Sequence, residues 1–275
     1  MSALHVFDQQ RYEILNRARA EVVSRLLAEL TVSLGIKTAV DVGCGLGYFS
    51  GFLKSLGLDV TAVDGRMQNV EEAQRRNPDI RFFRFDAEDP AIRSLGKFDL
   101  VFCFGLLYHL ENPFLAIRNL HAMTGKLLLG EGVIFPGDTP TMGLVDEFAL
   151  DDQGLNHIAF YPTEACLQKM SYCAGFRFLY RLTTLPAHVD YHRRGSTPKV
   201  RTMLAASHQL ITCPQLEVAP QPSMPIQPWD AQNVTAHTSS VETLRGFSQR
   251  PLSEKLKILS HIIRHKVSAQ RRAGG

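Results

Sequence analysis

The apolar positions near the start of the chain repeat with the period of an α-helix. Within residues 8–34 they recur every three or four positions, with charged side chains between them, at Ile14, Leu15, Ala18, Val22, Leu26, Leu27 and Leu30. A helix with this spacing has one apolar face and one polar face. The pattern therefore predicts an amphipathic helix ahead of the main domain.

Short, mainly apolar runs follow this helix, and helical patterns separate them. The expected strands are 38–42, 59–64, 80–86, 98–104 and 126–134, and the expected helices between them are 48–56, 67–76 and 112–123. Wholly apolar strands that alternate with helices are typical of a parallel sheet covered on both faces. The sequence therefore predicts a doubly wound, Rossmann-like α/β domain, in which ligands bind outside the carboxyl ends of the strands.

The alternation stops after the fifth expected strand. Residues 135–162 show few strand or helix signals. Loops of this length in compact domains are usually functional or disordered. We therefore expect residues 135–162 to form a lid over the ligand site.

A helix and two more strands are predicted after the lid. Thr163 is a favourable N-cap for a helix over 164–174, and Gly175 ends it. The runs 176–182 and 200–207 predict an antiparallel hairpin that closes the sheet. With the five parallel strands, this hairpin makes a seven-stranded mixed sheet.

Three glycines alternate just after the first expected strand, in VDVGCGLGYFS (40–50). Glycines in a strand-to-helix turn are typical where the backbone turns sharply or closely approaches a ligand, here at Gly43, Gly45 and Gly47. A dinucleotide-binding turn has glycine or alanine at the sixth position of G-x-G-x-x-G, and this chain has Tyr48 there. The spacing therefore favours a ligand without a pyrophosphate over NAD.

Aspartates close the next two expected strands. Asp64 follows Gly43 by 21 residues, where its carboxylate can accept both hydroxyls of a ribose. Asp86 ends the third strand, near the expected position of an adenine amino group. The alternative is that each aspartate only caps a helix or forms a turn.

The motifs AVDVGCGLG, AVD, FRFDAED and FDLVFCFGLLYHL occur in this order. Together they resemble the class I S-adenosylmethionine-dependent methyltransferases over residues 35–207. The resemblance implies S-adenosyl-L-methionine as the cofactor, with its methionine part near the glycines, its ribose at Asp64, its adenine at Asp86 and its sulfonium facing Phe104. The cofactor-binding residues that it implies are Asp41, Gly43, Cys44, Gly45, Gly47, Asp64, Gly65, Asp86, Ala87, Phe104 and Gly105.

Two longer segments, GLLYHLENPFLAIRNL and FYPTEACLQKMSYCAGF, are similar to a narrower branch of these enzymes. That branch holds sugar and natural-product O-methyltransferases and bacterial enzymes that modify wobble uridine in tRNA. On this basis we expect a methyltransferase domain over 1–208. Five prolines predict a semi-extended linker over 209–230, and residues 231–275 are expected to form a basic helical tail.

Methyl transfer to a hydroxyl requires a positioned acceptor and the removal of its proton. His109 follows the fourth expected strand and is the first candidate base, because imidazole titrates near neutral pH. The alternative is that His109 only packs in its loop. His157 is the second candidate, since the lid would carry it over the acceptor. Glu131 ends the fifth strand and either binds an acceptor hydroxyl or faces solvent.

Positive charge is concentrated at the end of the chain. The net charge is +3, but residues 245–275 hold eight Lys and Arg against one acid, and the preceding residues carry a net charge of −4. A helix over 252–267 has an apolar face made of Leu252, Leu256, Leu259, Ile263 and Val267. This helix suits a partner, a second copy of the chain or an acidic membrane surface, unless it docks on its own domain.

The acceptor expected from these features is a hydroxyl on a small metabolite or a sugar. The alternative is a methyl or carboxymethyl transferase that modifies tRNA or another RNA, because the basic tail could contact phosphates, but the rest of the chain is acidic. A non-catalytic cofactor-binding relative is the third alternative.

The composition sets the remaining expectations. The five cysteines form no CxxC pair, so reduced thiols without a bound metal are expected. No run of about 18 apolar residues is present, so we expect no membrane span and a cytoplasmic protein.

Overall fold

The computed structural model of the chain describes residues 5–147, 153–192 and 200–219. All of them belong to the first of two units, Met1–Pro228, and the second unit is Trp229–Gly275. The predicted basic tail and its helix over 252–267 therefore lie outside the described residues. No helix in the described part of the chain is both long enough and apolar enough to cross a bilayer.

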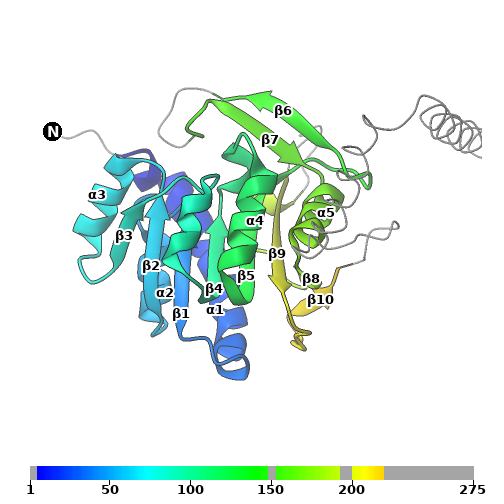
Figure 1. Ribbon diagram of the computed structural model, residues 1–275, viewed down its shortest axis with the longest axis horizontal. Coiled ribbons are helices and arrows are strands. Elements are labelled where there is room, and N and C mark those ends of the chain that lie inside the picture. The colour runs from blue at the N-terminus through cyan, green and yellow to red at the C-terminus, as the bar shows by residue number, and fades with distance from the viewer. Residues whose placement is uncertain (1–4, 148–152, 193–199, 220–275) are drawn as a thin grey trace, which may run out of the picture. The chain divides into compact units, whose positions relative to one another are not determined.

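The described residues form a central sheet of eight strands (Figure 1). Five strands are parallel, in the order β3-β2-β1-β4-β5, and β9, β8 and β10 follow as antiparallel neighbours. The bounds are β1 Thr38–Val42, β2 Asp59–Asp64, β3 Arg81–Arg84, β4 Phe98–Phe104, β5 Thr124–Ile134, β8 Phe178–Leu182, β9 Val200–Ser207 and β10 Leu216–Val218.

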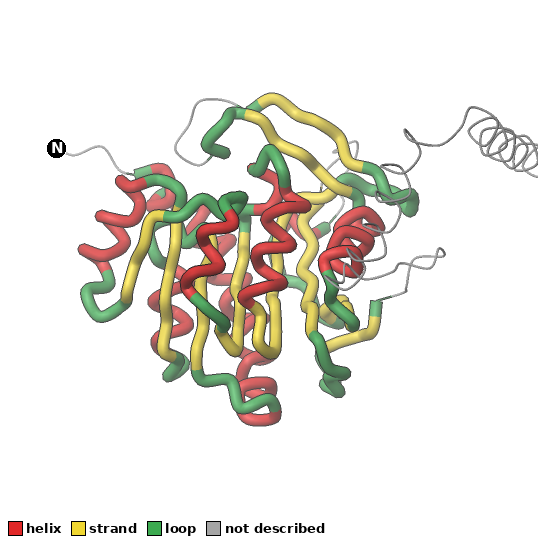
Figure 2. Tube along the Cα trace, in the orientation of Figure 1, coloured by secondary structure: helices red, strands yellow, loops and turns green. Residues whose placement is uncertain are grey.

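Helices cover both faces of this sheet (Figure 2). Buried side chains of α1 (Gln10–Ser33), α2 (Tyr48–Ser55) and α3 (Met67–Arg76) share one core with Leu100 and Phe102 of β4. Side chains of α4 (Pro113–Met123) and α5 (Glu164–Ala174) share a second core with Val101 and Cys103 of β4. Successive strand residues point to opposite faces, so an apolar strand such as β4 contributes to both cores.

The predicted α/β fold is confirmed, and the expected element boundaries hold to within two residues. The eighth strand, β10, was not predicted. It pairs with β8 inside the segment 209–230 that was expected to be a linker, and Ile211, Cys213 and Ala219 nearby are buried. The prolines of this segment predict a linker. Pro214 lies just before β10, however, and β10 is a short edge strand, where proline is tolerated. The linker expectation is therefore wrong for residues 209–219, and residues 220–230 lie outside the described residues.

The segment 135–162 contains two strands that were not predicted. β6 (Met142–Asp146) and β7 (Ile158–Pro162) pair as a separate antiparallel ribbon above the carboxyl ends of the sheet strands (Figure 1). A two-stranded ribbon is marginally stable by itself. This one packs through Ala159 and Tyr161 of β7 against Tyr108 and Val133, so long-range contacts decided its structure.

Thr163 joins the ribbon to α5. Its hydroxyl accepts a hydrogen bond from the Cys166 amide and donates one to the Thr139 carbonyl at 2.7 Å, and the residue is buried. We expect Thr163→Ala to lower the free energy of unfolding by about 1–2 kcal/mol in a urea titration, because loss of an N-cap costs this much. Thr163→Ser should keep most of the stability. A loss no larger than that of the exposed control Thr183→Ala would contradict the capping role.

Candidate functional site

One cavity of about 670 Å³ lies at the carboxyl ends of the parallel strands. Its walls come from the N-terminal region, the turn between β1 and α2, the loops after β2, β3 and β4, the ribbon segment and the start of β9. This is the position that the parallel strand order predicts for a ligand. The cavity is therefore the candidate site.

The glycine turn forms one wall of the cavity. Gly43 and Gly47 have φ values of +78° and +83°, which L-residues with side chains rarely adopt. A Cβ atom on Gly43 would lie 2.9 Å from Leu106 Cδ2, and one on Gly47 would lie 2.9 Å from Asn77 Nδ2. The backbone conformation therefore favours glycine at both positions, and at Gly43 the contact with Leu106 also leaves little space for a side chain.

Asp64 fixes the turn from the end of β2. Its Oδ2 accepts from the Gly45 amide at 2.9 Å, and its Oδ1 accepts from the Arg66 amide and the Asn69 side chain. Burial raises the pKa of Asp64 above its ordinary value, and the two amides and Asn69 oppose this shift. A carboxylate has about four acceptor positions, so Asp64 keeps room for one further donor, one fewer than the two ribose hydroxyls that we expected.

Asp41 does not line the cavity, contrary to the expectation. It lies on the same face of β1 as Ala39, because strand side chains alternate, and this face packs on α2. Its carboxylate accepts a 2.7 Å hydrogen bond from Ser50 Oγ of α2, and burial raises its pKa to about 7. Asp41 thus links β1 to α2, the two elements that the glycine turn connects. The other ten predicted cofactor residues all line the one cavity.

His109 lines the cavity at the end of a short 3-10 helix after β4. Its Nδ1 lies 2.6 Å from Oε1 of Glu147, which follows β6 and whose side chain is only 2% exposed. The other carboxylate oxygen of Glu147 accepts from the Gly154 amide at 2.8 Å. Among the described residues, Nε2 of His109 has no hydrogen-bond partner. A carboxylate at Nδ1 favours the tautomer whose Nε2 carries the lone pair.

His157, the second candidate base, is not among the cavity walls. It is exposed and has a φ of +57° at the end of the ribbon, where its carbonyl accepts from the Glu147 amide. This backbone conformation is rare for residues other than glycine. The hypothesis that His157 reaches the acceptor is therefore not supported by its position.

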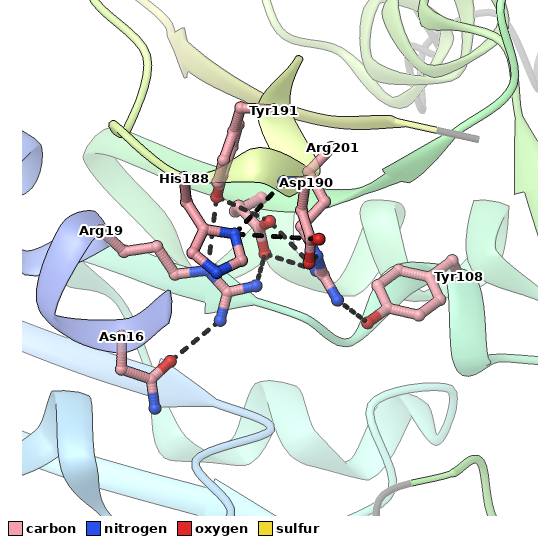
Figure 3. A network of polar contacts seen from close by, with 8 residues as sticks. Asn16, Arg19, Tyr108, His188, Asp190, Tyr191 and Arg201 are labelled. Carbon is pink, nitrogen blue, oxygen red and sulfur yellow. Dashed lines mark hydrogen bonds and ion pairs between the residues drawn. The ribbon is translucent and has the colours of Figure 1, made fainter. Parts of the chain in front are cut away.

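Glu131 neither faces solvent nor lines the cavity. It is buried and accepts hydrogen bonds from Arg19, Arg201 and Tyr191, at 2.9, 3.1 and 2.8 Å (Figure 3). These donors stand 112, 70 and 60 residues away from it. Sequence reasoning missed this cluster because no local pattern links such distant positions.

Polar contacts join residues 153–156, which lie between β6 and β7, to the body of the domain. Arg66 Nη2 donates to the carbonyls of Gln153 and Gly154 at 2.7 and 3.1 Å, and Asn156 donates to Glu111. A Cβ atom on Gly154 would lie 2.3 Å from the His109 carbonyl oxygen. The segment thus contacts the backbone beside the candidate base directly.

A family model described as a methyltransferase domain matches residues 40–126. The tRNA U34 carboxymethyltransferase of Pseudomonas syringae pv. tomato is 33% identical over 150 residues, which are 51% of this chain and 45% of that protein. The ubiquinone biosynthesis O-methyltransferase of Psychrobacter arcticus is 28% identical over 163 residues, or 53% and 62% of the two chains. This chain spans about half the length of the curated relatives it matches.

Solved structures share the fold at low sequence identity. The N-terminal domain of EvdMO1 with SAH bound aligns with a TM-score of 0.56 at 19% identity, over 71% of this chain and 81% of that one. CalS10, a SAM-bound amino pentose methyltransferase from Micromonospora echinaspora, aligns with a TM-score of 0.50 at 18% identity, over 76% and 100%. The family match over residues 40–126 confirms the predicted resemblance to the class I S-adenosylmethionine-dependent methyltransferases.

Proposed function

We propose that this chain transfers the methyl group of S-adenosyl-L-methionine to a hydroxyl of a small acceptor. One observation carries the proposal. The ten predicted cofactor residues and an imidazole paired with a buried carboxylate line the same cavity. A methyltransferase needs both functions at one place, because the acceptor oxygen must meet the methyl carbon in line with the sulfonium.

Successive strand ends would contact successive parts of the cofactor. Asp86 and Ala87 after β3 would contact the adenine, and Asp64 would accept one ribose hydroxyl. The glycine turn would lie against the methionine part, and Phe104 and Gly105 would face the sulfonium. The cofactor supplies the activated methyl group, so the protein's task is to orient the acceptor and accept its proton.

His109 is the proposed base. With Nδ1 held by Glu147, Nε2 is the nitrogen that can accept the proton of the acceptor hydroxyl. The buried carboxylate would stabilise the imidazolium that forms, as a carboxylate does beside the base of a catalytic triad. Glu147 comes from the segment 135–162, for which we propose the role of a lid. Its closure would bring this carboxylate to the base and exclude water.

The lid contacts favour a compact acceptor. Arg66, Glu111 and the His109 backbone hold the segment against the body of the domain, and a polynucleotide would need an open basic groove. An RNA acceptor is the second candidate, because several relatives are named tRNA U34 carboxymethyltransferases. For RNA, the predicted basic tail would supply phosphate contacts.

Incubation with methyl-labelled S-adenosylmethionine and fractionated cell extract tests the function. We expect label in the small-molecule fraction with the wild-type chain and much less with His109→Ala at equal protein. Label in RNA that disappears when residues 245–275 are deleted would replace the small acceptor with the alternative. No protein-dependent label in any fraction would contradict transferase activity.

A further inference from the structure

The buried cluster around Glu131 contains more positive than negative charge. Arg19 and Arg201 have side chains that are only 6% and 14% exposed, and the carboxylate between them, Glu131, is fully buried. Asp190 also lies 3.4 Å from Arg201 Nε, but its side chain is 43% exposed and is therefore screened by water. Buried charges are normally paired. One further anion would balance the excess positive charge of this cluster.

Arg201 retains a donor for such an anion. Its Nη1 donates to both carboxylate oxygens of Glu131, at 3.1 and 3.4 Å, Nη2 donates to Tyr108, and Nε lies 3.4 Å from Asp190. Of its five N–H groups, one on Nη2 therefore has no partner within the described residues. Tyr108 accepts from Arg201 Nη2 at 3.1 Å, which leaves its own O–H available to donate (Figure 3). Arg201 and Tyr108 both line the cavity.

The position of the cluster assigns it to the acceptor end of the cavity. Arg201 lies opposite Val133 at the start of β9, whereas the glycine turn follows β1 and Asp86 follows β3. In the order β3-β2-β1-β4-β5-β9, the cofactor residues occupy the ends of the first four strands, so the cluster lies beyond them. The strands are spaced about 4.8 Å apart, which places Arg201 two strands past Phe104.

The candidate base and Arg201 contact the same aromatic ring. The centroid of the Tyr108 ring lies 4.1 Å from that of His109 and 5.5 Å from Arg201 Cζ. A molecule with a hydroxyl at His109 could therefore reach Arg201 with a second group about one ring away. Guanidinium N–H groups form strong, charge-assisted hydrogen bonds to carboxylates and phosphates.

We propose that the acceptor carries an oxyanion, a carboxylate or a phosphate, which Arg201 and Tyr108 bind while the acceptor hydroxyl lies at His109. This inference rests on the proposed function and narrows its substrate class to small hydroxylated anions.

Calorimetric titration of the full chain, saturated with S-adenosylhomocysteine, tests the inference. The probes are inorganic phosphate, 4-hydroxyphenylacetate and the neutral 4-hydroxyphenylacetamide. We expect the wild type to bind the carboxylate at least about tenfold more tightly than the amide, since hydrogen bonds to charged groups are worth this much. Arg201→Gln should abolish the preference, and the exposed control Arg177→Gln should keep it. Tyr108→Phe leaves the charges in place and should reduce the preference several-fold, which covers the case in which Arg201→Gln does not fold.

Two results would overturn the inference without affecting the proposed function. One is S-adenosylhomocysteine binding with no preference for either anionic probe over the amide. The other is a large loss of S-adenosylhomocysteine affinity in Arg201→Gln, because the cluster would then hold the carboxylate of the cofactor itself. A wild-type chain that fails to bind S-adenosylhomocysteine contradicts the proposed function instead, and the inference falls with it.

Discussion

Replacing His109 with alanine should lower the turnover rate by about 10²–10⁴-fold, the usual contribution of a positioned general base. Affinity for S-adenosylhomocysteine should stay nearly unchanged, because the predicted contacts to adenine, ribose and the methionine part come from other residues. The measurement is release of S-adenosylhomocysteine at saturating cofactor, using the acceptor fraction that the labelling experiment identifies. A matched binding titration separates a catalytic defect from a loss of cofactor.

The pH dependence of turnover gives an independent readout of this role. The wild type should lose activity as pH falls, because a protonated imidazole cannot accept the acceptor proton. This acidic limb should disappear in His109→Ala, even if slow turnover survives through positioning alone. Near-normal turnover with the acidic limb intact would show that His109 is a structural residue of its loop.

Glu147 should act through His109 as a positioning residue. Glu147→Gln keeps an oxygen that can accept from His109 but removes the negative charge that would stabilise the imidazolium, so turnover should fall by about tenfold. The control Glu111→Gln alters another lid contact, the hydrogen bond from Asn156, without touching the imidazole. If both variants lower turnover equally, Glu147 contributes to lid closure and does not position the base.

Asp64→Ala should weaken S-adenosylhomocysteine binding by about 100-fold. The variant loses a charge-assisted hydrogen bond to the ribose, worth about 1.5–3 kcal/mol. It also releases the Gly45 and Arg66 amides that the carboxylate holds in place. Calorimetric titration measures the effect, and circular dichroism checks that the fold survives.

Asp59→Ala is the matched control for this variant. Asp59 begins the strand that Asp64 ends. Within the described part of the chain, its exposed side chain makes only a long contact, 3.7 Å, to Arg81. Its removal should leave the affinity unchanged. If Asp64→Ala and the wild type bind S-adenosylhomocysteine with equal affinity, the ribose does not bind at this end of β2. This result would contradict the proposed cofactor orientation.

The parts of the fold that were predictable are those whose contacts repeat along the sequence. The strands β1, β2 and β4 are mostly buried and mainly apolar, and α1 carries its apolar side chains at helical spacing. Gly43 and Gly47 were recognisable because glycine is the residue favoured where the backbone has a positive φ. The strand order then brought ten separate residues to one cavity, as parallel topology requires.

The parts that were missed depend on contacts between distant segments. Glu147 meets His109 across 38 residues, and no spacing in the sequence marks that pair. The same holds for Glu131 and its two arginines. A strand-end acid can face a ligand, solvent or a buried cation, and only the packed structure decides among them. The ribbon strands β6 and β7 were missed because their stability comes from docking on Tyr108 and Val133 rather than from local pattern.

Calorimetric titration of the purified full chain with S-adenosylhomocysteine, and separately with NADH, tests the central claim most directly. The claim is that the cavity at the strand ends binds the methyltransferase cofactor. The expected result is one site per chain with a Kd on the order of micromolar for S-adenosylhomocysteine and no heat from NADH. Binding of NADH with no response to S-adenosylhomocysteine would contradict the cofactor, the orientation along the strand ends and the reaction proposed for His109.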